Sequence, residues 1–554
     1  MFCVRFLVIF AFSVLSPCVL LAGVTTSGDV VPTSEPLTWD YGTEAYIGYH
    51  TAGGTMTINS GSIVQCFESY IGYESGISGE VTVDGANSTW DHYHSVYVGK
   101  NGDGILNITN GGTVNNVSVS IANMPGSTGL VNVDGANSTW NNTTYVYVCG
   151  KGNGTLNILN GGTVNDKAGW IGHWEDSVGK VTIDGTDSTW THTEEFYVGG
   201  AGSATLDIKN AGSVSNTIGY VAYYPGSSAN ITVDGPNSTW TNSEEFYVGH
   251  EGSGTLHITN GGSVSNTTGY IGYESGSSAE VTVDGTGSVW NNSSRLYVGY
   301  EGSGALNITN GGKVGADVVA IGSPYCVTSG EVTVDGPGAI LDSQRGLCVW
   351  SNNDGYGRLS ITNGGLVCVN GSVEIKGSEN HDAFINMATG GMLALWGEAD
   401  ESLEVFFDLI DGDDTIQWWN NLIGTEGDWA PLTTAAYGHE YRLDYITDGD
   451  LAGYTVLTVG EGHIPGDANK DNIVDGSDAT ILANHWQYGV SGEADATWSM
   501  GDFNGDGAVD GSDATILATY WQTIATTTAV PEPSAVALFL LMVGMGLVLK
   551  KRRV

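Results

Sequence analysis

The stretch VTVDGANSTW, residues 81–90, returns with small changes at residues 131, 181, 231 and 281, a spacing of 50 residues without slippage. Midway between these copies lies a second motif, LNITNGG at residue 106, whose variants begin at residues 156, 206, 256 and 306. The two motifs alternate every 25 residues, so one structural unit is about 25 residues long. A fixed period of this kind indicates a short piece of structure stacked on copies of itself.

Each unit places apolar residues at every second position and ends the run in a tight turn. Val81 and Val83 alternate with polar residues, and Asp84 and Gly85 follow them. This pattern predicts short β-strands. Three such strands per unit predict an all-β fold, a parallel β-solenoid over residues 31–395, which the usual crossover preference makes right-handed. Roughly fourteen coils at about 4.8 Å each give a uniform rod, without a pocket, roughly 65–70 Å long.

A β-propeller is the main alternative, because its blades also repeat at about 40–50 residues. The half-period of 25 residues and the very short strands favour the solenoid.

Aromatic residues recur at two positions of the coil. Because Val96 before Tyr97 is apolar, alternation turns the tyrosine outward if the valine points inward. An outward ladder could stack on the rings of polysaccharide or matrix glycans. We favour the simpler interpretation that the rings of each series stack on one another and stabilise the rod. The two series are Trp90, Trp140, Trp190, Trp240 and Trp290, and Tyr46, Tyr70, Tyr97, Tyr147, Trp170, Tyr197, Tyr220, Tyr247, Tyr270 and Tyr297.

The sequence shows no catalytic motif. It contains no HExxH, GxSxG or P-loop pattern, and coils of equal length leave little room for the irregular loops that build a catalytic cleft. We therefore expect no catalytic residue and no enzyme, and residues 332–460 are the only place to look for one. Asp84 and its equivalents before glycine form either a cation ladder or, as we favour, simple turns.

The composition points to an extracellular protein. Residues 1–22 combine an early Arg5 with an apolar run and small residues, as in a secretory signal peptide. The net charge of −44 excludes nucleic acid as a partner, because a polyanion would be repelled. The five cysteines beyond residue 22 show no CxxC spacing, so we expect small buried residues rather than a disulfide framework or a zinc site. They are Cys66, Cys149, Cys326, Cys348 and Cys368.

The C-terminal end has three parts. Residues 524–534 are a Thr-rich linker ending near Pro531-Glu532-Pro533, and residues 535–554 are an apolar segment followed by basic residues. This is a membrane anchor or a sorting signal. The order of the parts resembles the PEP-CTERM sorting tail, which implies an exosortase-type partner and a place at the bacterial cell surface or matrix. The repeats resemble PEP-CTERM- and autotransporter-associated repeats, which implies a displayed, adhesive β-helix.

Residues 396–461 break the repeat. Strand-like stretches there contain Trp418, Trp419, Trp429 and Tyr454. Because the last coil of a solenoid needs a cover, we predict a β-rich cap, with a small carbohydrate-binding unit as the alternative.

Residues 462–523 contain two similar loops 35 residues apart. Each has oxygen-bearing side chains at loop positions 1, 3, 5, 9 and 12 and a backbone carbonyl at position 7, the arrangement with which EF-hand loops bind calcium, although position 12 is Asp rather than Glu. We expect two calcium ions and a helix after each loop, from Ala479 and from Ala514. The candidate ligands are Asp467, Asn469, Asp471, Ile473, Asp475 and Asp478, and Asp502, Asn504, Asp506, Ala508, Asp510 and Asp513.

Two loop–helix units in tandem resemble a type I dockerin domain, a small α-helical module that docks on cohesins. The resemblance implies a cohesin-like scaffold partner and recognition at Ser477 and Ser512, in the stretch GSDATILA that both units share. The duplication would permit two docking orientations. The helices lack the basic residues usual in that family. Calcium is expected to order this domain, since metal binding is coupled to folding.

Two functions follow from these observations. The first is a non-enzymatic surface or matrix protein whose rod is a spacer or adhesin, docked through calcium. The second is a polysaccharide-active enzyme or glycan-binding subunit of a dockerin–cohesin assembly.

Overall fold

The computed structural model describes residues 23–352, 355–377, 383–388, 390–411, 415–420, 428–435, 441–460, 468–469, 473–488, 500–501, 508–519 and 521. The chain divides into two compact units, one of residues 1–387, 392–434 and 444–457 and one of residues 388–391, 435–443 and 458–554. The predicted signal peptide, linker and membrane segment lie outside the described residues. Within the described ranges, none of the helices has the length and apolar character needed to span a membrane.

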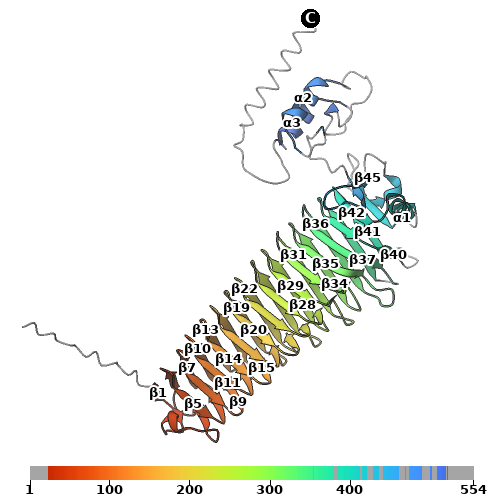
Figure 1. Cartoon of the computed structure of the whole chain (residues 1–554). Helices are drawn as coiled ribbons and strands as arrows, with labels where there is room; N and C mark the ends of the chain where they lie inside the picture. Colours follow the sequence, from red (N-terminus) through yellow and green to blue (C-terminus); the bar gives the residue numbers. More distant parts are fainter. Residues whose placement is uncertain are drawn as a thin grey trace, which may run out of the picture. The chain divides into compact units, whose positions relative to one another are not determined.

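The first unit is a parallel β-solenoid, as predicted, with about 14 turns of about 25 residues. Each coil contains one long and two short strands, for example β10 (Asp103–Thr109), β11 (Thr113–Asn116) and β12 (Ser118–Ile121). Strands of successive coils pair in parallel and in register, so Leu106 lies between Val81 and Val131. Figure 1 shows the resulting row of strands along the rod.

The strands form three series along the rod, with two fused strands. The long strands are β4 Gly54–Asn59, β7 Ser78–Asp84, β10, β13 Thr128–Asp134, β16 Asn153–Leu159, β19 Val178–Asp184, β22 Ser203–Lys209, β25 Ser228–Asp234, β28 Ser253–Thr259, β31 Ser278–Asp284, β34 Ser303–Thr309, β36 Ser329–Asp335, β38 Tyr356–Thr362 and β41 Ala383–Met387. The first short strands are β5 Ile63–Cys66, β8 Thr89–His92, β11, β14 Thr139–Asn142, β17 Thr163–Asp166, β20 Thr189–His192, β23 Ser213–Asn216, β26 Thr239–Asn242, β29 Ser263–Asn266, β32 Val289–Asn292, β39 Leu366–Val369 and β42 Gly391–Trp396. The second short strands are β3 Glu44–Ile47, β6 Glu68–Ile71, β9 Ser95–Val98, β12, β15 Tyr145–Val148, β18 Ala168–Ile171, β21 Phe196–Val198, β24 Gly219–Val221, β27 Glu245–Val248, β30 Thr268–Ile271, β33 Arg295–Val298 and β40 Ser372–Lys376, and the fused strands are β35 Lys313–Ile321 and β37 Ile340–Trp350.

The core consists of the inward residues of all three series. Leu106 and Ile108 are fully buried, and so is every tryptophan of the Trp90 series. Val114 lies in register between Trp90 and Trp140. Large and small side chains therefore alternate from coil to coil, which explains why the sequence repeats every 50 residues rather than every 25.

A buried polar ladder accompanies the tryptophans, and the sequence analysis missed it. Trp140 Nε1 donates to Asn116 Oδ1 at 2.7 Å, and Asn116 Nδ2 donates to Asn142 Oδ1 at 2.6 Å. The ladder satisfies the indole N–H groups inside the core. In one coil pair, Asp166 and His192 replace the two asparagines. The side chains of both are fully buried, with Asp166 Oδ1 2.6 Å from His192 Nδ1.

The Asp-Gly positions are turns, as we favoured. Asp84 Oδ1 accepts hydrogen bonds from Thr109 Oγ1 at 2.7 Å and Asn110 Nδ2 at 2.6 Å of the next coil. Gly85 has a φ of +87°, which favours glycine. The carboxylates thus tie neighbouring turns together.

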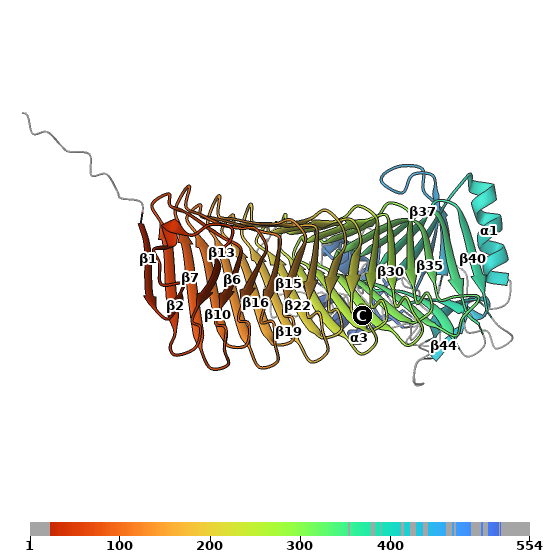
Figure 2. The same cartoon turned by 90° about the horizontal axis from the view of Figure 1, so that it is seen from below.

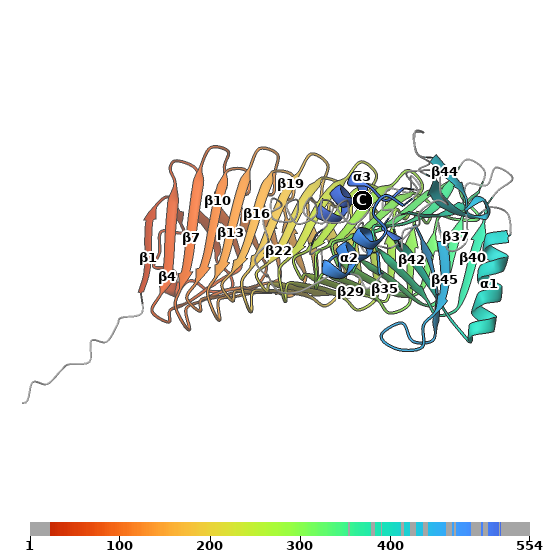
Figure 3. The same cartoon turned by 90° about the horizontal axis from the view of Figure 1, so that it is seen from above.

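Non-repeating elements lie at both ends of the rod (Figures 2 and 3). At the start, β1 pairs with β4 antiparallel. At the other end, a helix, α1 (Ala399–Asp411), forms in part of the region that we expected to be β-rich. The side chain of Phe406 in this helix is fully buried, so the helix packs through it. Ser402 of α1 hydrogen-bonds Thr455 at 2.7 Å, and Val456 packs on Cys368 and Ala394 of the last coils. The elements are β1 Gly23–Gly28, β2 Val30–Val31, η1 Pro36–Thr38, α1 Ala399–Asp411, β43 Ile416–Asn420, β44 Asp428–Pro431, η2 Leu432–Thr434, β45 Tyr441–Tyr445 and β46 Tyr454–Val459.

The expectation for the cysteines holds in part. All five are free. Cys66, Cys149 and Cys368 are buried, whereas Cys326 and Cys348 are partly exposed.

The second unit contains the two expected helices. They are α2 (Gly476–Asn484) and α3 (Gly511–Thr519), and each begins three residues before the predicted start, Ala479 or Ala514. Val474 and Leu482 from the first loop–helix repeat share one buried core with Val509 and Leu517 from the second. The two repeats are therefore halves of one small domain.

Candidate metal centre

The first loop closes on the start of α2 through two carboxylates. Asp475 Oδ1 accepts the backbone N–H of Ser477 at 2.7 Å, and Asp478 Oδ2 accepts the backbone N–H of Asp475 at 2.9 Å. This reciprocal arrangement is a capping box, which satisfies the free N–H groups of the first helical turn. Asp478 Oδ1 also accepts the N–H of Asn469 at 3.1 Å. Loop positions 3 and 12 are thereby brought together.

The second loop repeats this geometry with its own residues. Asp510 N donates to Asp513 Oδ2 at 2.8 Å, and Ser512 N donates to Asp510 Oδ1 at 2.7 Å. Asp478 and Asp513, the two position-12 residues, are both fully buried. Two segments 35 residues apart thus adopt the same hydrogen-bonded structure.

These residues fit a calcium ion. A buried carboxylate is costly unless a positive charge and hydrogen bonds compensate it, and calcium prefers oxygen ligands such as these. The described candidate ligands are Asn469, Ile473, Asp475, Asp478, Ala508, Asp510 and Asp513. Asp467, Asp471, Asp502, Asn504 and Asp506 lie outside the described residues. Among the described residues, no group of three or more His, Cys, Asp or Glu side chains is placed to hold a metal ion. An ion held here would order the loops rather than react.

Ser477 and Ser512 take equivalent positions at the two helix starts. Both serines are exposed, and the backbone N–H of each is held by the capping aspartate before it. Because α2 and α3 share one core, the domain presents two similar exposed surfaces.

Comparison with known families agrees with this geometry. Residues 465–529 match the model of the Dockerin type I domain. Residues 465–529 carry a type I dockerin domain. The dockerin domain makes calcium plausible as its metal and supports a cohesin-like protein as a possible partner. Together with the solenoid, it suggests an extracellular or cell-surface protein.

Other comparisons add little to the dockerin match. No curated protein matches the chain. Among solved structures, the chain is similar to the crystal structure of a TibC-catalysed hyper-glycosylated TibA fragment, with 14% identity. The match covers 59% of this chain and 92% of that one, with a TM-score of 0.35. A likeness this weak assigns neither a fold nor a function.

The outward tyrosines of the rod stack on one another. The rings of Tyr220 and Tyr247 are 5.0 Å apart and inclined by 8°, and those of Tyr247 and Tyr270 are 4.7 Å apart and inclined by 3°. Val96 and its equivalents are buried while the tyrosines are half-buried, so the predicted outward direction is correct. From Trp170 to Tyr297 each ring stacks on the next ring of the series, which supports the self-stacking interpretation over stacking on glycans.

A second aromatic row flanks this ladder, and the sequence analysis missed it. Tyr223, Tyr273 and Tyr300 lie three residues after members of the first series, and that fixed spacing was the available signal. Tyr273 packs edge-on against Tyr270, at 5.0 Å and 77°, and is stacked on Tyr300 at 5.3 Å. Burial raises the pKa of Tyr220 and of Tyr270 to about 12.

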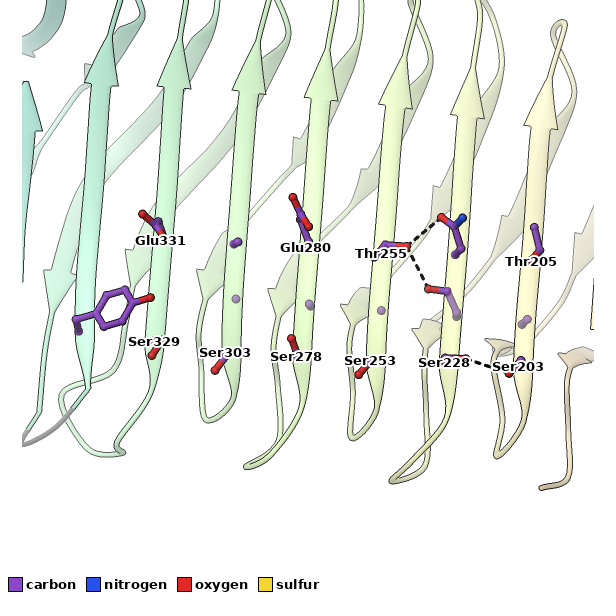
Figure 4. A pocket seen from close by; sticks show the side chains of 18 residues that line it. Ser203, Thr205, Ser228, Ser253, Thr255, Ser278, Glu280, Ser303, Ser329 and Glu331 are labelled. Carbon is purple, nitrogen blue, oxygen red and sulfur yellow. Dashed lines mark hydrogen bonds between the residues drawn. The ribbon is translucent and has the colours of Figure 1, made fainter. Parts of the chain in front are cut away.

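A groove on the long-strand face departs from the predicted uniform shaft. It has a volume of about 710 Å³ and runs over the starts of β22 to β38, where each long strand from β22 to β36 begins with a serine (Figure 4). The groove is lined mainly by Ser, Ala, Gly and Thr. It forms because these small side chains do not cover the strands. Glu280 and Glu331 stand two coils apart, about 10 Å at the usual strand spacing. This separation is close to that of the two carboxylates in inverting glycosidases, which lie about 6.5–9.5 Å apart.

Proposed function

We propose that this chain is a secreted, non-enzymatic protein of the bacterial cell surface or extracellular matrix. Its β-solenoid is a structural or adhesive rod, and its dockerin domain attaches the rod through calcium to a cohesin-like scaffold protein. The observation that carries the proposal is the duplicated capping geometry, in which buried Asp478 and Asp513 sit beside exposed Ser477 and Ser512.

The solenoid supports a mechanical role. Its coils repeat one register from β4 to β36, and the carboxylates at the turns tie each coil pair together. Such a body presents the same side chains many times along its length, which suits a spacer or a surface of repeated weak contacts.

The duplication within the dockerin domain predicts the outcome of a docking experiment. We expect the full chain to bind a cohesin module in calcium and to lose binding in EGTA. Because each helix start is a separate docking surface, Ser477→Arg or Ser512→Arg alone should reduce affinity only about twofold. The two together should abolish binding.

Surface plasmon resonance against a panel of immobilised cohesins measures these effects. Ser303→Arg is the matched control, because Ser303 is an exposed serine of the rod. Binding that persists in EGTA, or a double variant that binds as well as the wild type, would overturn the proposal.

We also propose that residues 524–554 direct the chain to the envelope as a sorting tail read by an exosortase-type enzyme. Mass spectrometry of the protein isolated from its own envelope tests this idea. A mature C-terminus near Pro531 is expected, and an intact tail would contradict processing.

The alternative, a polysaccharide-active enzyme, is favoured by one feature only, the groove with Glu280 and Glu331. We expect no polysaccharide cleavage by the full chain. Cleavage that Glu280→Gln and Glu331→Gln abolish would replace the non-enzymatic proposal.

A further inference from the structure

Near the far end of the tyrosine ladder, the rod has a small polar pocket with a positive wall. The pocket has a volume of about 220 Å³ and is lined from β30, β33, β35 and β37. Arg295 and Arg345 enter it from strands two coils apart. They are two of only four arginines between residues 23 and 460, in a chain with a net charge of −44.

The charge at this position is inverted relative to the two preceding copies of the repeat. Arg295 lies one and two copies of the 50-residue repeat after Glu245 and Glu195, and its neighbour Ser294 lies one and two copies after Glu244 and Glu194.

 The register of β35 with β33 and β37 places Arg345 at the position of Ser294 in the copy before it. A row that is acidic along the middle of the rod therefore becomes basic at this pocket.

The tyrosine ladder also ends here, which leaves one ring face open. Tyr270 stacks on one face of Tyr297 at 5.1 Å and 10°. On the other side, the register partner of Tyr297 is Ala320, which has no ring to stack. Tyr297 lines the pocket, and its hydroxyl accepts a hydrogen bond from Arg295 Nη1 at 3.2 Å. At this end of the ladder, the ring of Tyr297 therefore has a face available to a ligand.

The remaining polar groups suit a ligand with hydroxyls. Thr268 and Ser294 contribute hydroxyl groups to the pocket wall, and Asp317 contributes a carboxylate. Asp317 Oδ2 lies 3.4 Å from Arg345 Nη2, so two guanidinium groups face one carboxylate and the wall keeps a net positive charge. The volume is below the roughly 300–1,000 Å³ that encloses a drug-sized ligand, which matches a single sugar residue.

We propose that this pocket binds a sugar residue that carries a carboxylate, such as a uronic acid of an acidic polysaccharide. A guanidinium group pairs with a carboxylate through two parallel hydrogen bonds. The apolar face of the sugar ring packs on the open face of Tyr297, and its hydroxyls bond to Asp317 and the neighbouring hydroxyl groups. The proposal deepens the adhesive role proposed for the rod and does not depend on the dockerin domain.

Calorimetric titration of the full chain tests the site. The probes are a galacturonic acid oligosaccharide, the matching neutral galactose oligosaccharide, sodium acetate and sodium sulfate. All titrations contain EGTA, so that calcium bridges and the dockerin domain play no part. An ionic strength of about 0.15 M limits the reach of distant acidic residues to about 8 Å.

We expect the acidic oligosaccharide to bind at least tenfold more tightly than the neutral one and than either simple anion. Replacing both arginines, Arg295→Gln with Arg345→Gln, should weaken its binding at least tenfold, which corresponds to about 1.4 kcal/mol. Tyr297→Leu should also weaken the binding of the acidic oligosaccharide. Arg358→Gln is the matched control, because Arg358 packs over Tyr356 outside the pocket.

Three results would overturn the proposal. Equal binding of acidic and neutral oligosaccharides would remove the role of the carboxylate, and binding of acetate or sulfate as tight as that of the oligosaccharide would indicate a simple anion site. A double arginine variant that keeps the wild-type circular dichroism spectrum and the wild-type affinity would place the ligand elsewhere. Loss of cohesin docking, in contrast, would leave these titrations unchanged.

Discussion

Replacing Asp478 with alanine tests the calcium centre at a fully buried candidate ligand. The Asp478 carboxylate accepts the N–H groups of Asn469 and Asp475 at 3.1 and 2.9 Å and is fully buried. A hydrogen bond to a charged group contributes about 1.5–3 kcal/mol, so the loss of both bonds costs about 3–6 kcal/mol. Calcium at 100 times its dissociation constant stabilises a site by about 2.7 kcal/mol. The free energy lost with the two hydrogen bonds matches or exceeds the stabilisation that calcium supplies, so the first loop should stay open even in excess calcium.

Hydrogen–deuterium exchange of the full chain, read by mass spectrometry, measures this effect region by region. In the wild type, calcium should slow exchange in both α2 and α3. In Asp478→Ala the protection of α2 should fall more than that of α3, and Asp513→Ala should reverse this order. Ser477→Ala is the control, because the Ser477 side chain is exposed. If calcium protects α2 of Asp478→Ala as well as it protects the wild type, the reasoning is wrong.

Three further predictions concern the rod. Asp166→Ala removes one partner of the buried Asp166–His192 pair and should destabilise its coil by about 3–5 kcal/mol. The double variant Asp166→Asn with His192→Asn copies the neighbouring coils and should restore protection from hydrogen exchange. Equal exchange in both variants would contradict this. Trp240→Ala should cost about 3–5 kcal/mol through the cavity it leaves, seen as a lower melting temperature, and an unchanged melting temperature would argue against a packed core. Burial raises the pKa of Tyr220 and of Tyr270 to about 12, so the folded rod holds these protons more tightly than the unfolded chain, where the pKa is near 10. The resulting stabilisation is complete below about pH 10 and is lost as the pH rises to about 12. Melting curves followed by circular dichroism over that pH range should show a falling melting temperature.

Local sequence patterns were enough to predict the solenoid. Alternation at Val81 and Val83 fixed which residues face the core, and the strict period fixed the register, because equal coils can stack in only one way. The turn chemistry at Asp84 was also predictable from the dipeptide alone. These features depend on contacts between residues at constant spacing, so one sequence reveals them.

Features that depend on particular partners were harder to predict. Asn116 was missed because asparagine in a Gly-rich repeat suggests turns, yet it lies in the core beside Trp140. The α1 helix was missed because its apolar residues, such as Phe406, were interpreted among strand-like neighbours. The arginine pocket was missed because Arg295 and Arg345 become neighbours only through stacking, after a shift in coil length that the period does not show.

For the dockerin domain, the sequence named the loop positions, and the structure adds how the described ones connect. The spacing of oxygen-bearing residues predicted Asp478 and Asp513 as ligands. It could not show that the same two side chains also cap the following helices, since that depends on helix starts at Gly476 and Gly511.

The alternation of tryptophan and valine along the core sets the smallest step by which the rod can change length. Deleting one coil would place two indoles face to face in space that fits an indole and an isopropyl group, whereas deleting two adjacent coils restores the original neighbours. Lengthening or shortening through duplication should therefore proceed in blocks of 50 residues, each changing the span by about 9–10 Å. Duplication or deletion of such blocks can thus change the length of the rod in even steps without altering any packing interface.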